Sequence, residues 1–130
     1  MDAIPKKILI VEDDELLIEQ MQHALQEDGH EVSTAHDGEV GLAKALESKP
    51  DLVLLDIVIP KVNGLEFLQK LHESDWGKTV PVIVLTNMDN NTHLSQVLAL
   101  GSYDYLVKTE WTLAALLSKV REKLGLPAQA

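Results

Sequence analysis

The 130-residue sequence contains no cysteine, which excludes disulfide bonds, thiolate metal sites and thiol nucleophiles. Aromatic residues make up only 4% of the chain. No apolar run approaches the roughly 18 residues that a membrane-spanning helix needs. The N-terminal residues also lack the apolar stretch of a signal peptide, so the sequence predicts a cytoplasmic protein.

Positive charge is scarce as well. The chain has 11 Lys and Arg against 21 Asp and Glu, which gives a formal net charge of −10. Such a surface repels nucleic acids and anionic membranes unless basic residues gather locally, and the sequence has no basic run. We therefore expect neither nucleic acid nor a membrane as a direct partner.

Short apolar runs alternate with segments of helical periodicity along the chain. Five runs predict strands, at residues 6–11, 30–35, 51–60, 80–86 and 103–108. The segments that follow them repeat apolar residues at helical spacing and predict five helices. Among these segments, Leu42 and Leu46 are expected on one face of their helix, and Leu113 begins the apolar face of the last helix.

Strands that alternate with helices and are apolar on both faces are typical of a parallel sheet covered on both sides. Hydrophobic residues form 45% of the chain, enough for one domain with a substantial core. The sequence thus predicts a doubly wound α/β fold with a five-stranded parallel sheet. We expect a single domain over residues 1–130, with its core at about 6–124 and a frayed tail at 125–130.

Polar residues stand where the predicted strands end. They are Glu12, Asp13, Asp14, Asp56, Thr86 and Lys108. In doubly wound sheets, ligands bind beyond the carboxyl ends of the strands. Alone, Asp14 is explained as a helix cap and Thr86 as a turn residue. Asp56 differs, because a carboxylate inside so apolar a run is costly unless it is paired or bound to a metal.

Taken together, these residues indicate phosphoryl chemistry. Carboxylate oxygens and water are the ligands of Mg²⁺, and a cation would offset the repulsion among Glu12, Asp13 and Asp56. With Lys108 adding positive charge, one carboxylate could attack a phosphorus centre. Thr86 could hydrogen-bond a phosphoryl oxygen. The cluster predicts a site that receives a phosphoryl group on Asp56.

The segments "ILIVEDDELL", "DLVLLDIVIPKVNGLEFL", "VIVLT" and "YDYLVK" resemble the response-regulator receiver domain of two-component signalling. The resemblance covers about residues 6–124. It implies a flavodoxin-like sheet in the order 2-1-3-4-5. It also implies that Asp56 takes a phosphoryl group from a sensor histidine kinase or a phosphotransfer protein. Such a domain catalyses only its own phosphotransfer and dephosphorylation and is not otherwise an enzyme.

The same resemblance implies roles for further residues. The backbone carbonyl of Val58 would hold Mg²⁺ together with the three carboxylates, and Thr86 and Lys108 would contact the phosphoryl group. Thr86 and Tyr105 would form a switch. That switch would act on a face formed by the fourth helix, the fifth strand and the fifth helix, where an unknown downstream protein docks. The resemblance implies no cofactor besides Mg²⁺.

One position departs from the family pattern. Lys108 is followed by Thr109, whereas most members have a proline there after a cis bond. A non-proline cis bond costs about 2.5–4 kcal/mol, so we expect either a trans peptide with a reshaped loop or local strain. This departure leaves open an alternative, namely a receiver-like interaction module that is not phosphorylated.

Overall fold

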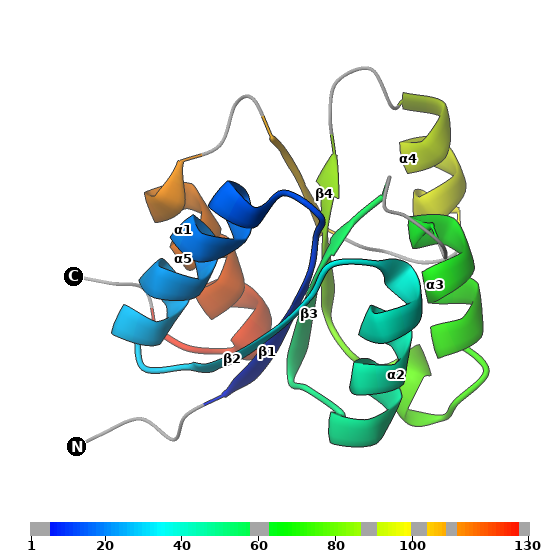
Figure 1. Ribbon diagram of the computed structural model, residues 1–130, viewed down its shortest axis with the longest axis horizontal. Coiled ribbons are helices and arrows are strands. Elements are labelled where there is room, and N and C mark those ends of the chain that lie inside the picture. Colours follow the sequence, from blue (N-terminus) through cyan, green and yellow to red (C-terminus); the bar gives the residue numbers. More distant parts are fainter. Residues whose placement is uncertain (1–5, 58–62, 87–90, 100–103, 109–111, 128–130) are drawn as a thin grey trace.

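The computed structural model describes residues 6–57, 63–86, 91–99, 104–108 and 112–127. Within these residues, five strands form one sheet with helices on both sides (Figure 1). The strands are β1 (Lys7–Val11), β2 (Glu31–Ala35), β3 (Leu52–Asp56), β4 (Val82–Thr86) and β5 (Asp104–Val107). The helices are α1 (Glu15–Glu27), α2 (Gly38–Ser48), α3 (Gly64–Leu71), α4 (Asn91–Leu98) and α5 (Leu113–Leu124), with a 3₁₀ turn at Trp76–Lys78.

The predicted fold class is confirmed. The strand order is β2-β1-β3-β4-β5, and every neighbouring pair is parallel. After β1 the chain first adds β2 on one side and then β3 on the other, so the direction of winding reverses between β1 and β3. The carboxyl ends of these two strands therefore border the crevice where doubly wound folds bind ligands.

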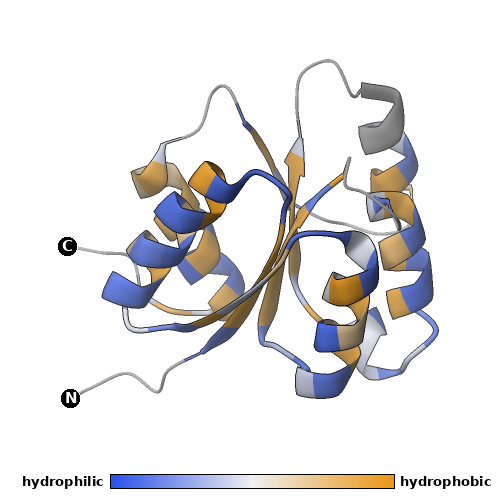
Figure 2. Cartoon of the chain, viewed as in Figure 1, coloured by the Kyte–Doolittle hydropathy of each residue, from blue (hydrophilic) through white to orange (hydrophobic). Residues whose placement is uncertain are grey.

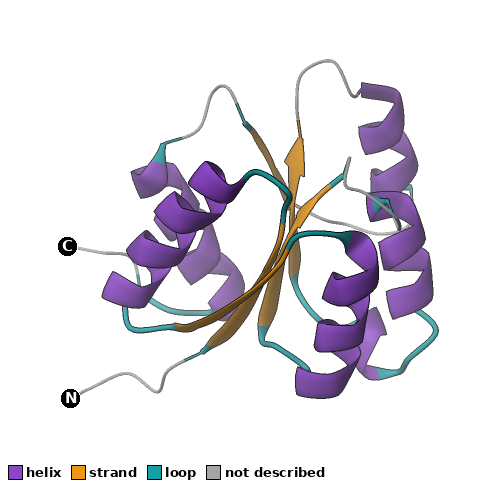
Figure 3. Ribbon diagram, viewed as in Figure 1, coloured by secondary structure: helices purple, strands orange, loops and turns teal. Residues whose placement is uncertain are grey.

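Two apolar layers hold the helices to the sheet. Helices α1 and α5 cover one face, and α2, α3 and α4 cover the other (Figures 1 and 3). Along β1, Ile8 and Ile10 belong to the first layer, while Leu9 and Val11 belong to the second. This alternation follows from the two-residue repeat of a strand. Figure 2 shows the apolar residues of the helices turned toward the sheet.

Two leucines of the predicted apolar helix faces are exposed. Leu46 is 41% exposed and Leu113 is 42% exposed, so neither is a core residue. In α2, small residues replace large ones at the sheet: Ala45 is buried, and a Cβ on Gly41 would lie 2.8 Å from the methyl groups of Val11. Small residues let α2 approach the sheet closely, and Leu46, one position after Ala45, lies outside this contact face.

The polar residues at the ends of the helices and strands agree better with the predictions from the sequence. The Asp14 side chain accepts hydrogen bonds from the backbone N–H groups of Leu16 at 3.1 Å and Leu17 at 3.2 Å. It therefore caps α1, as predicted. The third strand ends at Asp56, earlier than the predicted 51–60, and residues 58–60 lie outside the described residues. No described helix is long and apolar enough to cross a bilayer.

Candidate functional site

The structure gathers the predicted polar residues at the carboxyl edge of the sheet. Asp56 is the last residue of β3 and Thr86 the last of β4, while Glu12 and Lys108 directly follow β1 and β5. Because the strands are parallel and in register, their carboxyl ends reach the same edge. Carboxylate oxygens of Glu12, Asp13 and Asp56 lie within 4.8 Å of one another.

Lys108 joins two of these carboxylates. Its Nζ donates to Oε1 of Glu12 at 2.6 Å and to Oδ2 of Asp56 at 2.8 Å. The backbone N–H of Lys108 donates to the carbonyl of Thr86 at 2.7 Å, which holds the lysine at the end of β4. Glu12 has no exposed surface and Asp56 is 4% exposed, so these charge-assisted hydrogen bonds form away from water.

Burial governs the protonation of this cluster. Burial, with the nearby negative charge of Asp56, raises the pKa of Glu12 to about 8, although Lys108 opposes the shift. Burial disfavours the Lys108 ammonium, but its hydrogen bonds to Asp56 and Glu12 outweigh that effect and raise its pKa. The two shifts thus favour the charged ammonium of Lys108 and the protonated carboxyl of Glu12.

The donor set fits a divalent cation. Three carboxylates converge from two neighbouring strands, and Oε2 of Glu12 is buried without a hydrogen-bond partner among the described residues. A buried oxygen of this kind is unusual in a folded protein unless a ligand completes it. Asp13 is exposed, which leaves the cluster accessible from solvent. Val58 lies outside the described residues, as does Thr109.

Thr86 and Tyr105 lie on neighbouring strands. Tyr105 is in register with Val84, two residues before Thr86, so all three side chains belong to one face of the sheet. Thr86 is buried, whereas Tyr105 is 45% exposed. In this conformation, therefore, the Tyr105 side chain is not fully packed.

One contact beside Asp56 was not predicted from the sequence. The N–H of Gly64 donates to the carbonyl of Ile57 at 2.8 Å, and a Cβ at this position would lie 2.7 Å from Cα of Ile57. Only glycine allows α3 to begin so close to the end of β3. The feature of the sequence that could have indicated this contact is the glycine itself, which directly follows the capping residue Asn63.

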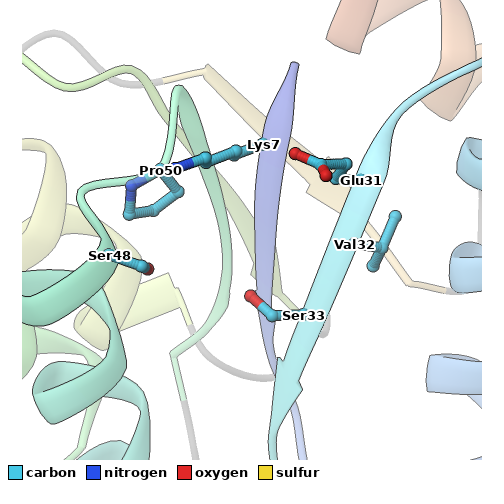
Figure 4. Close-up of a pocket in the computed structure, with 6 residues that line it drawn as sticks. All are labelled: Lys7, Glu31, Val32, Ser33, Ser48 and Pro50. Carbon is cyan, nitrogen blue, oxygen red and sulfur yellow. The ribbon is translucent and has the colours of Figure 1, made fainter. Parts of the chain in front are cut away.

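A pocket of about 210 Å³ lies elsewhere, at the amino ends of β1 and β2 (Figure 4). Its lining residues are Lys7, Glu31, Val32, Ser33, Ser48 and Pro50. Lys7 and Glu31 begin their strands, whereas the carboxylate cluster lies where strands end. The pocket is therefore separate from the candidate site.

Known proteins resemble this chain over most of its length. The family model of the response regulator receiver domain matches residues 8–121. The probable transcriptional regulatory protein SilR of Salmonella typhimurium is 42% identical over 118 residues, which cover 91% of this chain and 50% of that protein. The alkaline phosphatase synthesis transcriptional regulatory protein PhoP of Bacillus subtilis is 39% identical over 103 residues, covering 79% of this chain and 42% of that protein. The chain thus spans about half the length of the curated relatives it matches.

Solved structures show the same fold. A CheY-like response regulator receiver domain protein from Methanospirillum hungatei has a TM-score of 0.85 and 31% identity, covering 94% of this chain and 95% of that one. The receiver domain of a sensor histidine kinase from Pseudomonas aeruginosa has a TM-score of 0.85 and 25% identity, covering 94% and 99%. That receiver domain holds a magnesium ion in its active-site cleft.

Proposed function

The chain belongs to the response regulator receiver domain family of two-component signalling, and we propose that Asp56 is its phosphoacceptor. Receiver domains of response regulators interact with histidine kinases or phosphotransfer proteins. The observation that carries the proposal is the 2.8 Å contact between Lys108 and Asp56 at the carboxyl edge of the sheet. The contact places the Lys108 ammonium beside the acceptor carboxylate, where it can also stabilise the negative charge of a phosphoryl group bound to that carboxylate.

Mg²⁺ binding at an acidic cleft is general to this family, and we propose that Glu12, Asp13 and Asp56 hold the ion here together with the backbone carbonyl of Val58. The close approach of the three carboxylates and the unpartnered oxygen of Glu12 support this assignment. Bound Mg²⁺ would supply positive charge that neutralises the carboxylates and the oxygens of an incoming phosphoryl group.

The chain's own residues then divide the work of transfer. An oxygen of Asp56 forms a bond to phosphorus, and the bond from phosphorus to the donor's histidine nitrogen breaks with its electron pair leaving on nitrogen. Lys108 moves its hydrogen bond from Asp56 to a phosphoryl oxygen, and the Thr86 hydroxyl donates to another. Thr86 ends β4, which lies beside β3, and Lys108 follows β5, one strand further from β3.

Output would pass through Thr86 and Tyr105. Movement of Thr86 toward the phosphoryl group would open space on the face it shares with Tyr105, and the exposed ring could turn inward. The surface formed by α4, β5 and α5 would then change and alter the docking of a downstream protein. We also propose that residues 1–130 form one receiver domain, which catalyses its own phosphotransfer and dephosphorylation and no other reaction.

The test uses a small phosphodonor. Wild-type protein incubated with acetyl phosphate and Mg²⁺ should gain one phosphoryl group by intact mass spectrometry, and Asp56→Asn should gain none. Asp75→Asn is the matched control, because Asp75 is fully exposed and precedes β4, whose other end borders the cluster. Phosphorylation of Asp56→Asn would refute the assignment. No phosphorylation of wild type, even by histidine kinases, would favour the unphosphorylated interaction module.

A further inference from the structure

A second cluster of charged residues lies at the other edge of the sheet, where α1 and α5 end and β2 begins. Arg121 of α5 donates from Nε to Oδ2 of Asp28 at 2.9 Å and from Nη2 to Oδ1 at 2.6 Å. Its Nη1 donates to the carbonyl of Pro127 at 2.8 Å. Arg121 therefore ties the end of α1 to the chain that leaves α5. We call this set of hydrogen bonds the Arg121 clamp.

His30 is buried beside the clamp. Its side chain is 3% exposed, and Nε2 lies 3.6 Å from Oδ2 of Asp28, which is too long for a hydrogen bond. Neither ring nitrogen has a hydrogen-bond partner among the described residues. A buried imidazole without partners is unusual, and nothing in the proposed phosphoryl chemistry uses it.

The surroundings keep this histidine neutral. Burial lowers the pKa of His30, and the positive charges of Arg121 and Lys6 act in the same direction, while Asp28 alone opposes them. These three groups come from α5, from the residues before β1 and from the end of α1. Asp28 already accepts two hydrogen bonds from Arg121, so its negative charge is already paired with the guanidinium.

A proton on His30 would place a second cation beside Arg121 with one carboxylate to share. The imidazolium, whose Nε2 lies 3.6 Å from Oδ2 of Asp28, can be stabilised by taking that oxygen from Nε of Arg121. This exchange breaks the bidentate contact that orients the guanidinium, and the hydrogen bond from Nη1 to Pro127 depends on that orientation. We propose that protonation of His30 opens the Arg121 clamp and releases Leu126 and Pro127, so that acidification loosens the chain as it leaves α5.

The direction of the effect follows from linkage. A histidine that titrates at lower pH in the closed form than in the open form binds its proton preferentially in the open form. Opening is therefore unaffected above about pH 6.5, the ordinary value for histidine, and becomes easier below it. Uptake of one proton limits the change to about tenfold in the opening equilibrium per pH unit.

The amide of Leu126 reports this opening, because its N–H donates to the carbonyl of Arg121 at 2.8 Å. The experiment follows hydrogen exchange of that amide in the whole chain by NMR from pH 7.5 to 5.5, corrected for the intrinsic pH dependence of exchange. Its protection should be constant above about pH 6.5 and fall by up to about tenfold per unit below it. The Nε–H signal of Arg121 should shift over the same range.

Two variants isolate His30. In His30→Gln the protection should be flat with pH. In His23→Gln it should fall as in wild type, because His23 is an exposed histidine of α1 that pairs with Glu27 at 3.1 Å. An unchanged pH dependence in His30→Gln would overturn the proposal. Titration of the His30 ring without any change at Arg121 or Leu126 would overturn it too.

A further variant keeps the test decisive if His30→Gln does not fold. Arg121→Gln removes the clamp while leaving His30 in place, so the Leu126 amide should exchange rapidly at pH 7.5 and show no further loss on acidification. Protection at Leu126 equal to that of wild type would show that the clamp does not hold this segment, and the proposal would fail.

Discussion

Nζ of Lys108 lies 2.6 Å from Oε1 of Glu12, although the two residues are 96 positions apart in the sequence. They follow β5 and β1, and two strands, β3 and β4, lie between those strands in the sheet. The ammonium is thus shared between Glu12 and the proposed acceptor Asp56. On the proposed function, a phosphoryl group on Asp56 would compete with Glu12 for this cation.

Replacement of Lys108 tests the strength of that sharing. Lys108→Met removes two charge-assisted hydrogen bonds from a buried site and should lower the free energy of unfolding by about 2 kcal/mol without Mg²⁺. Added Mg²⁺ should reduce the loss, because a cation takes over the neutralising role. Urea unfolding with and without Mg²⁺ measures both values. Lys78→Met is the control, since among the described residues it breaks only an exposed pair with Asp75 and should change stability little.

The acidic residues after β1 should differ in metal binding. Asp13 belongs to the carboxylate cluster, whereas Asp14 caps α1. Asp13→Asn should weaken Mg²⁺ binding at least about tenfold. Loss of a residue that merely orients a metal ligand lowers metal affinity about 10- to 100-fold, and loss of the ligand itself should lower it no less. Asp14→Asn removes the same charge but preserves the cap, because Asn caps helices as well as Asp. NMR titration with Mg²⁺ compares the two, and equal losses would contradict the proposed ligand set.

Mg²⁺ affinity should depend on pH through Glu12. Burial raises the pKa of Glu12 to about 8, so below that pH the carboxyl must lose a proton before it can bind a cation. Affinity should therefore rise with pH by up to about tenfold per unit and level off above about pH 8. Calorimetric titration in buffers of different ionisation enthalpy would detect the released proton.

Glu12→Gln should bind Mg²⁺ more weakly at high pH and show little of this pH dependence. Glu19→Gln, which changes an exposed residue of α1, should behave as wild type. A pH dependence that persists unchanged in Glu12→Gln would assign the proton to another group.

Activation should alter the face formed by α4, β5 and α5. Beryllofluoride with Mg²⁺ imitates the phosphorylated state, and the resulting chemical-shift changes should cluster at residues 86–110. Thr86→Ala should weaken the changes at Tyr105, because it removes the hydroxyl proposed to move toward the phosphoryl group. Thr79→Ala is the control, since its exposed hydroxyl bonds only the nearby carbonyl of Trp76 among the described residues. Changes confined to α1 would refute the proposed switch.

Local sequence patterns were sufficient to predict much of this protein. Runs apolar on both faces predicted a parallel sheet, and the alternation of strands and helices predicted its winding. Because parallel strands bring their carboxyl ends to one edge, the polar residues that end them were expected to meet. Glu12, Asp13, Asp56 and Lys108 do meet there, and Asp14 caps α1 as its position indicated.

Other features depended on how the elements pack. Strand order brings Lys108 to Glu12, which is completely buried. The exposure of Leu46 depends on which face of α2 meets the sheet. The cluster of Asp28, His30 and Arg121 joins residues 93 positions apart at its extremes. Periodicity shows which face of an element is apolar, but it does not show which distant side chain lies opposite. Charge pairing, burial and protonation were therefore decided by the tertiary structure, because each depends on the distances between elements.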